Sequence, residues 1–200
     1  YTGTVKRIIV ITGASSGIGK EFARQILDFR HADELWLVAR RKERLLELKA
    51  ELESTQKTSA CTQGKKPLVI RVIPEDISGR QGYQLFSQLF AEEAKAGSFV
   101  VDTLVNNAGF GTYGPFEETP VERELEMVEL NITSLTGICG AALPYLPSGS
   151  SIINVASLAA YIPLGNFAVY AASKSYVRNF SLALAAELKD KGIHVLALCP

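Results

Sequence analysis

Residues that could do chemistry occur in two groups near opposite ends of the chain. The first is a glycine-rich segment at residues 12–19, TGASSGIG. The second consists of Ser157, Tyr170 and Lys174. A glycine-rich turn can accommodate a pyrophosphate, and a phenol beside an ammonium group can exchange a proton with a carbonyl oxygen. Together the two groups predict hydride transfer between a nicotinamide dinucleotide and a carbonyl or an alcohol.

Tyr170 and Lys174 are four residues apart, which places both side chains on one face of a helix. A nearby ammonium group favours phenolate and lowers the pKa of a tyrosine from its usual ~10. Ser157 follows a predicted strand, where doubly wound sheets bind ligands, and its hydroxyl can hold a substrate oxygen. The alternative is that the Tyr-x-x-x-Lys spacing arises by chance on an amphipathic helix and that Ser157 only caps a turn.

The glycine-rich turn lies between the first predicted strand and the first predicted helix. Glycine permits a tight turn and lets a diphosphate approach the backbone, while the first amides of the helix face the phosphates. Glycine turns without a ligand are the alternative. The residues of this segment predicted to bind the cofactor are Gly13, Ser15, Ser16, Gly17, Ile18 and Gly19.

The residues after the second predicted strand indicate which dinucleotide binds. A site for NAD usually has a carboxylate about 20 residues beyond the glycines. Here Ala39 occupies that region and Arg40 and Arg41 follow. A guanidinium can bind the 2′-phosphate of NADP in a bidentate manner, so we predict a preference for NADP(H) over NAD(H). Two solvated arginines at a helix start are the alternative.

Short β-branched runs alternate with longer helical patterns, which predicts one α/β domain over residues 1–200. Strands are expected at residues 7–11, 35–39, 68–73, 100–105, 151–155 and 193–198, and helices at 18–30, 41–54, 79–96, 121–143 and 170–189. Residues 54–66 are expected to form a solvated loop. The strands are apolar on both faces, as in a buried parallel sheet. The predicted fold is a Rossmann-type, doubly wound, three-layer α/β/α sheet in the order 3-2-1-4-5-6.

The composition argues against several classes of function. The formal net charge of zero gives no broad field for nucleic acid or an acidic membrane. No apolar run reaches the roughly 20 residues that span a bilayer. Three widely separated cysteines have neither the spacing of a zinc site nor an even number for a disulfide framework, so we expect no metal and a cytoplasmic setting.

The chain resembles the short-chain dehydrogenase/reductase family, in its subtype of roughly 250 residues. The resemblance covers nearly the whole chain and rests on motifs in the same order and spacing. They are residues 12–19, Asp76-Ile77, Asn106-Asn107-Ala108-Gly109, Asn131, Ser157, and Tyr170 with Lys174.

The resemblance implies a role for each matching residue. Tyr170 would be the general acid or base, Lys174 would lower its pKa and bind the nicotinamide ribose, and Ser157 would orient the substrate oxygen. Asn131 would hold a water in a proton relay; an asparagine bonded to its own helix backbone is the alternative. Asp76 and Ile77 would flank the adenine, and Pro200 would contact the cofactor. Support of the central sheet and contact with the adenosine ribose would come from Asn106, Asn107, Ala108 and Gly109.

One departure from the family concerns the end of the chain. The family continues past this point with a Pro-Gly pair, a substrate-covering segment and a seventh strand, whereas this sequence stops at Pro200. We therefore expect the seventh strand to be missing here and the natural protein to continue. We expect the unpaired sixth strand to be prone to aggregation.

Two helical regions, at residues 121–143 and 170–189, are rich in apolar and small residues. A sheet buries only one face of each helix, so a second apolar face predicts a homodimer or homotetramer; a larger core is the alternative. Aromatic residues in the predicted loops, such as Tyr113 and Phe167, do not identify the small carbonyl or alcohol substrate.

Two other functions compete with the reductase. A non-catalytic dinucleotide sensor or scaffold would not need both Tyr170 and Lys174, which are present. A sugar-nucleotide epimerase or dehydratase also uses Tyr-x-x-x-Lys, but the glycine spacing of such enzymes is Gly-x-x-Gly-x-x-Gly, which differs from the spacing here.

Overall fold

A computed structural model describes residues 5–29, 32–63 and 67–200, which contain one six-stranded parallel sheet in the order β3-β2-β1-β4-β5-β6. Its strands are β1 (Lys6–Thr12), β2 (Glu34–Val38), β3 (Val69–Ile73), β4 (Phe99–Asn106), β5 (Ser151–Val155) and β6 (His194–Leu198). The predicted strand order is confirmed. The order reverses between β1 and β4, and in such sheets ligands bind beyond the carboxyl ends of the strands at that point.

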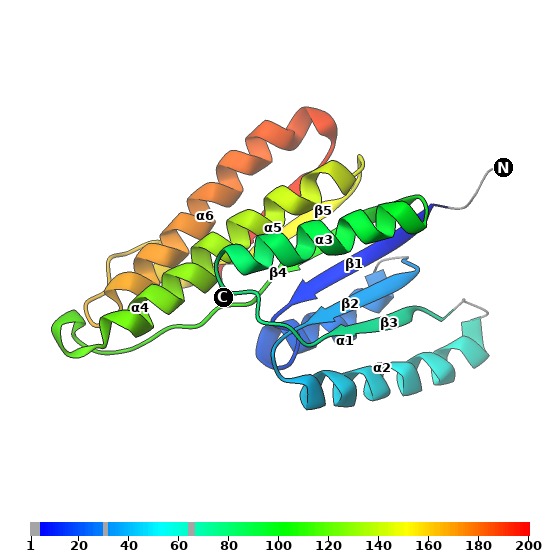
Figure 1. Cartoon of the computed structure of the whole chain (residues 1–200), viewed down its shortest axis with the longest axis horizontal. Helices are drawn as coiled ribbons and strands as arrows, with labels where there is room; N and C mark the ends of the chain where they lie inside the picture. The colour runs from blue at the N-terminus through cyan, green and yellow to red at the C-terminus, as the bar shows by residue number, and fades with distance from the viewer. Residues whose placement is uncertain (1–4, 30–31, 64–66) are drawn as a thin grey trace.

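Helices cover both faces of this sheet (Figure 1). They are α1 (Gly17–Phe29), α2 (Lys42–Gln63), α3 (Arg80–Ala96), α4 (Val121–Val128), α5 (Leu135–Ala142) and α6 (Ala168–Leu188). Side chains of α1 and α2 pack on one face, and those of α3, α5 and α6 pack on the other. The three-layer prediction is therefore confirmed.

Alternating strand residues feed two separate cores. Ile9 and Ile11 of β1 point to the face under α1 and α2, whereas Ile8 and Val10 point to the opposite face. On that opposite face Trp36 is fully buried and stacks on Phe90, with ring centroids 5.7 Å apart. Burial on both faces explains why the strands carry nearly continuous apolar runs.

The loop predicted at residues 54–66 is wrong in its larger part, because α2 continues to Gln63. No glycine or proline interrupts the sequence before Gly64. Gln56 also ties the helix to the chain entering β3, since its side-chain amide accepts from the Leu68 N–H at 2.6 Å and donates to the Leu68 carbonyl at 3.3 Å. Residues 64–66 of the predicted loop, and Arg30 at the predicted end of α1, lie outside the described residues.

The helix predicted at residues 121–143 has a different internal structure. A π-helical turn, Glu129–Ser134, separates α4 from α5 and contains Asn131. Single π turns inside helices occur frequently at functional sites, because they redirect side chains that a regular helix would place elsewhere. This turn sets the position of Asn131 relative to the segment that follows β4.

No helix within the described ranges has both the length and the apolar character that a bilayer crossing needs.

Candidate functional site

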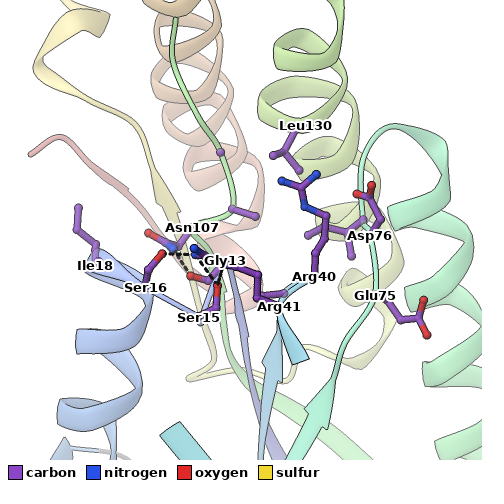
Figure 2. A pocket seen from close by; sticks show the side chains of 15 residues that line it. Gly13, Ser15, Ser16, Ile18, Arg40, Arg41, Glu75, Asp76, Asn107 and Leu130 are labelled. Carbon is purple, nitrogen blue, oxygen red and sulfur yellow. Dashed lines mark hydrogen bonds between the residues drawn. The ribbon is translucent and has the colours of Figure 1, made fainter. Parts of the chain in front are cut away.

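A cleft of about 540 Å³ opens beyond the carboxyl ends of β1, β2 and β4 (Figure 2). Its lining contains most of the residues predicted to bind the cofactor, namely Gly13, Ser15, Ser16, Gly17, Ile18, Arg40, Arg41, Asp76, Ile77, Asn107, Ala108 and Gly109. Ala39, Glu75 and Leu130 also line the cleft and were not predicted. Ala39 and Glu75 adjoin predicted residues, whereas nothing in the sequence singles out Leu130.

The glycine-rich turn is attached to the end of β4. Asn107 donates from its side-chain amide to the main-chain carbonyls of Thr12 (3.2 Å) and Gly13 (3.1 Å). The N–H groups of Asn107 and Ala108 both donate to the Thr12 hydroxyl at 3.1 Å. Gly13 has a φ of +66°, and a Cβ there would lie 2.7 Å from the Asn107 amide nitrogen. Only glycine therefore fits at position 13.

Gly19 is needed for packing and does not line the cleft. A Cβ at position 19 would overlap the Gly13 carbonyl oxygen, so α1 can begin this close to the turn only with glycine there. The first residues of α1, Gly17 and Ile18, line the cleft, so the positive end of the helix dipole lies beside it. These features fit a dinucleotide diphosphate.

The two arginines after β2 point in different directions (Figure 2). Arg41 turns back to the glycine-rich turn, where its Nη2 donates to the hydroxyls of Ser15 (3.0 Å) and Ser16 (2.8 Å). Arg40 extends toward the side of the cleft where Asp76 and Leu130 lie. The pair thus places two guanidinium groups in the lining of the cleft, and guanidinium groups bind phosphate by charge-assisted hydrogen bonds.

Asp76 lies on the opposite side of the cleft from Ser16 (Figure 2), and Ile77 is also part of the lining. The Asp76 side chain is exposed and accepts a hydrogen bond from the Ser78 N–H at 3.0 Å, whereas Ile77 is buried. An apolar side chain beside a short polar one can pack against a flat ring and bond to its edge.

Ser157 lies directly beyond β5, at the start of a short 3-10 helix, Leu158–Ala160. Its hydroxyl oxygen accepts a hydrogen bond from the Ala159 N–H at 3.2 Å, so Ser157 caps this turn. The hydroxyl hydrogen can still donate to a substrate oxygen. The Pro200 carbonyl accepts from the Leu158 N–H at 3.0 Å. Pro200 therefore holds the turn that carries Ser157.

Tyr170 and Lys174 share the first turns of α6. The ammonium nitrogen of Lys174 lies 5.7 Å from the centroid of the Tyr170 ring and donates to the Val155 carbonyl at 2.9 Å. Lys174 is only 7 % exposed, and this burial lowers its pKa to about 8, partly opposed by the nearby Cys199. The structure thus places an ammonium group of lowered pKa beside a phenol on one helix face.

The side chain of Asn131 does not bond to its own helix backbone. Its amide instead holds the segment after β4: Oδ1 accepts from the Phe110 N–H at 3.1 Å and Nδ2 donates to the Phe110 carbonyl at 2.9 Å. Nδ2 also donates to the Ser173 hydroxyl at 3.0 Å. Asn131 therefore links α6 to the backbone beside the cleft.

Gly109 lies between the cleft-lining residues and the Tyr170–Lys174 pair. It lines the cleft, and a Cβ at this position would lie 2.9 Å from Asn131 Oδ1 and 3.5 Å from Lys174 Nζ. Tyr170, Lys174 and Pro200 themselves lie outside the cleft lining. The structure thus brings the glycine-rich turn and the Tyr170–Lys174 pair to opposite sides of one short segment.

Within the described part of the chain, no group of three or more His, Cys, Asp or Glu side chains could hold a metal ion. Cys139 and Cys199 are free. Cys139 is buried between Asn106 and Asn154, and desolvation raises the pKa of its thiol to about 12. Such a thiol is inert at neutral pH, so it contributes packing and not chemistry.

Comparisons with known proteins agree with the fold. The sequence profile of the short chain dehydrogenases matches residues 7–200. The probable oxidoreductase EphD of Mycobacterium tuberculosis is 31% identical over 196 residues, which are 96% of this chain but 30% of that protein.

Two solved structures have the same fold over nearly the whole chain. The bulky-bulky ketone specific alcohol dehydrogenase of Comamonas testosteroni has 29% identity and a TM-score of 0.81, covering 99% of this chain and 73% of that one. A short-chain dehydrogenase of Sphingobium yanoikuyae in complex with NADPH has 28% identity and a TM-score of 0.80, covering 97% of this chain and 70% of that one.

Proposed function

The chain belongs to the short-chain dehydrogenase family, and on that premise we propose that it is an NADP(H)-dependent oxidoreductase that interconverts a carbonyl and an alcohol. The observation that carries the proposal is the position of Gly109, which lies in the dinucleotide cleft and beside Lys174. A nicotinamide that reaches this point would lie next to the one phenol–ammonium pair on α6.

A bound reduced nicotinamide would supply the hydride for the carbonyl carbon. Tyr170 gives its phenolic proton to the carbonyl oxygen in reduction and accepts it back in oxidation. Ser157 donates a hydrogen bond to the same oxygen as negative charge develops there. Lys174 holds its ammonium nitrogen 5.7 Å from the centroid of the Tyr170 ring, where it would stabilise negative charge that develops on the phenol as the proton leaves.

Asn131 is proposed as the fourth member of this group. Both hydrogens of its amide nitrogen are used by Phe110 and Ser173. A water that links Lys174 to solvent would therefore have to bind the second lone pair of Asn131 Oδ1 or its main-chain carbonyl.

The preference for NADP(H) over NAD(H) rests on Arg40 and Arg41. Both line the cleft, and Arg41 is already held against Ser15 and Ser16. A 2′-phosphate would bring charge-assisted hydrogen bonds to these guanidinium groups. The similar structure from Sphingobium yanoikuyae was solved with NADPH, which supports the same choice here.

The proposed partners are a small carbonyl or alcohol substrate and a second copy of the chain. Exposed apolar side chains on α4 and α6, including Val121, Leu125 and Leu182, supply the second helix face that a homodimer or homotetramer would bury. The free thiols of Cys139 and Cys199 fit a reducing compartment such as the cytoplasm.

Replacing Tyr170 with phenylalanine tests the proposal, because it removes the hydroxyl and keeps the ring. Turnover of carbonyl substrates should fall by roughly 10²–10⁴-fold, the usual contribution of a general acid. NADPH affinity should stay within about twofold, since Tyr170 does not line the cleft. Substantial residual turnover would mean that another group moves the proton, and NADPH binding without any turnover in the unaltered protein would favour the sensor alternative.

A further inference from the structure

The backbone at Gly111 lies in direct contact with the ring of Tyr170. A Cβ at position 111 would lie 2.8 Å from Cδ2 of that ring and 3.1 Å from both Cε2 and Cγ. Ordinary van der Waals contacts of a Cβ begin at 3.4 Å. The φ of Gly111 is not in the left-handed region, so its backbone conformation suits any residue. Glycine is therefore required at this position by the ring and not by the turn.

The segment that carries Gly111 is held on both sides. On one side the Asn131 amide bonds to both the N–H and the carbonyl of Phe110, and the Arg123 guanidinium lies 3.9 Å from the centroid of the Phe110 ring. On the other side the Gly114 N–H donates to the Asn166 carbonyl at 2.9 Å. A side chain added at position 111 would thus meet a fixed backbone behind it and would displace the ring in front of it.

The same segment also contacts Lys174. The position of a Cβ on Gly109 lies 3.5 Å from Lys174 Nζ, and that nitrogen is fixed by its hydrogen bond to Val155. Gly109 and Gly111 therefore face the ammonium group and the phenol ring, respectively. One short segment therefore contacts both members of the pair.

We propose that Gly111 is a positioning residue, whose bare backbone leaves room for the Tyr170 ring in the place beside Lys174 where it can transfer a proton to the substrate. The proposal rests on the proposed function of Tyr170 as the general acid and base. The segment after β4 would then have two roles, since Gly109 lines the cleft and Gly111 positions the Tyr170 ring.

A methyl group at position 111 would displace the Tyr170 ring and lower kcat. The methyl would push the Tyr170 ring out of its present position, because its carbon would lie only 2.8 Å from ring atom Cδ2. A misplacement of about 1 Å at a reacting group lowers kcat by about 10- to 100-fold. Binding of NADPH should not change, because Gly111 does not line the cleft.

The experiment compares Gly111→Ala with the control Gly97→Ala, which adds the same methyl before β4 instead of after it. Nothing lies within 4 Å of a Cβ at position 97, and its φ of 161° is extended backbone. Gly111→Ala should lower kcat about tenfold or more, change the pH profile of kcat, and leave the NADPH Kd within about twofold. The control should match the unaltered protein in all three.

Two further measurements do not depend on a known substrate. Phenolate absorbance, with the spectrum of Tyr170→Phe subtracted, gives the pKa of Tyr170 before and after Gly111→Ala. In a Tyr170→Ala background the ring is gone, so Gly111→Ala should no longer lower the Tm. This cycle also covers the outcome in which Gly111→Ala alone folds poorly.

The outcomes separate this proposal from the one on which it rests. An unchanged kcat, pH profile and phenol pKa in Gly111→Ala would overturn the positioning role, whatever Tyr170→Phe does. A loss of stability that persists in the Tyr170→Ala background would overturn it too, since the methyl would then be clashing with something other than the ring. Retained turnover in Tyr170→Phe would instead overturn the proposed function.

Discussion

Because the charged side chain of Lys174 is buried, we predict that it lowers the stability of the folded protein. Its ammonium group is 7 % exposed and has one described hydrogen-bond acceptor, the Val155 carbonyl. Burial lowers its pKa from 10.5 to about 8. A difference of this size corresponds to about 3 kcal/mol of unfavourable free energy for the charged form, as an upper estimate.

Lys174→Met removes the charge and keeps a side chain of similar length. The variant loses the hydrogen bond to Val155, which contributes about 1–2 kcal/mol. The net result is a protein more stable than the original by about 1–2 kcal/mol at pH 7, although it has lost its proposed catalytic ammonium. For a chain of this size the gain corresponds to a Tm roughly 2–8 °C higher.

The sign of the pH dependence follows from linkage. Between pH 8 and pH 10.5 the unfolded chain holds a proton on Lys174 that the folded chain has released, so the stability of the unaltered protein rises with pH in this window. The advantage of Lys174→Met should therefore be complete below about pH 8 and should shrink as the pH rises to 10.5.

Urea unfolding at pH 7, 8, 9 and 10, analysed by linear extrapolation, measures this difference. Lys49→Met is the control, because Lys49 is a solvent-accessible helix residue paired with Glu53 at 3.6 Å and should show no such pH dependence. An advantage of Lys174→Met that is constant across the series would refute the reasoning, as would a less stable variant at pH 7.

Three further predictions concern the cleft and the core. Arg40→Asp should weaken NADPH binding about tenfold or more and narrow the NADPH/NADH preference, measured by fluorescence titration; an unchanged preference would remove Arg40 from the proposed phosphate site. Trp36→Ala should cost about 3–5 kcal/mol in urea unfolding, because it empties a fully buried site and removes the stack on Phe90; a cost below about 1 kcal/mol would contradict this packing. Gln56→Ala should cost about 1–2 kcal/mol by losing both hydrogen bonds to Leu68, and an unchanged free energy of unfolding would show that α2 does not depend on them.

The sheet could be predicted because its strands are buried on both faces. Such strands appear as continuous apolar runs, and strict β-α alternation with right-handed crossovers leaves few possible strand orders. The extension of α2 to Gln63 could not be predicted in this way. Its sequence from Ser54 is polar and lacks a helical apolar stripe, and the bonds from Gln56 to Leu68 join residues whose pairing depends on the fold.

The cleft lining could be predicted where it lies within a few residues of a strand end, because the carboxyl ends of parallel strands meet at one edge. Gly13 and Asn107 follow their strands directly, and Arg40 and Asp76 lie two and three residues beyond theirs. Leu130 could not be predicted, because it lines the cleft only through the π-helical turn.

The contact between Gly111 and Tyr170 also could not be predicted from the sequence. Neither the spacing nor the type of these residues indicates that the backbone at one touches the ring of the other. The distance follows from the tertiary arrangement, in which Asn131 holds Phe110 beside α6. Close approaches of this kind depend on several elements at once, so a local pattern does not reveal them.

Parallel titration of one folded sample with NADPH and with NADH tests the central claim most directly. The account predicts saturable binding of NADPH and binding of NADH that is about tenfold weaker or more, because only NADPH carries the 2′-phosphate that Arg40 and Arg41 would bind. Binding of neither dinucleotide by a folded protein would contradict the account, since the cleft at the glycine-rich turn would then have no dinucleotide to hold.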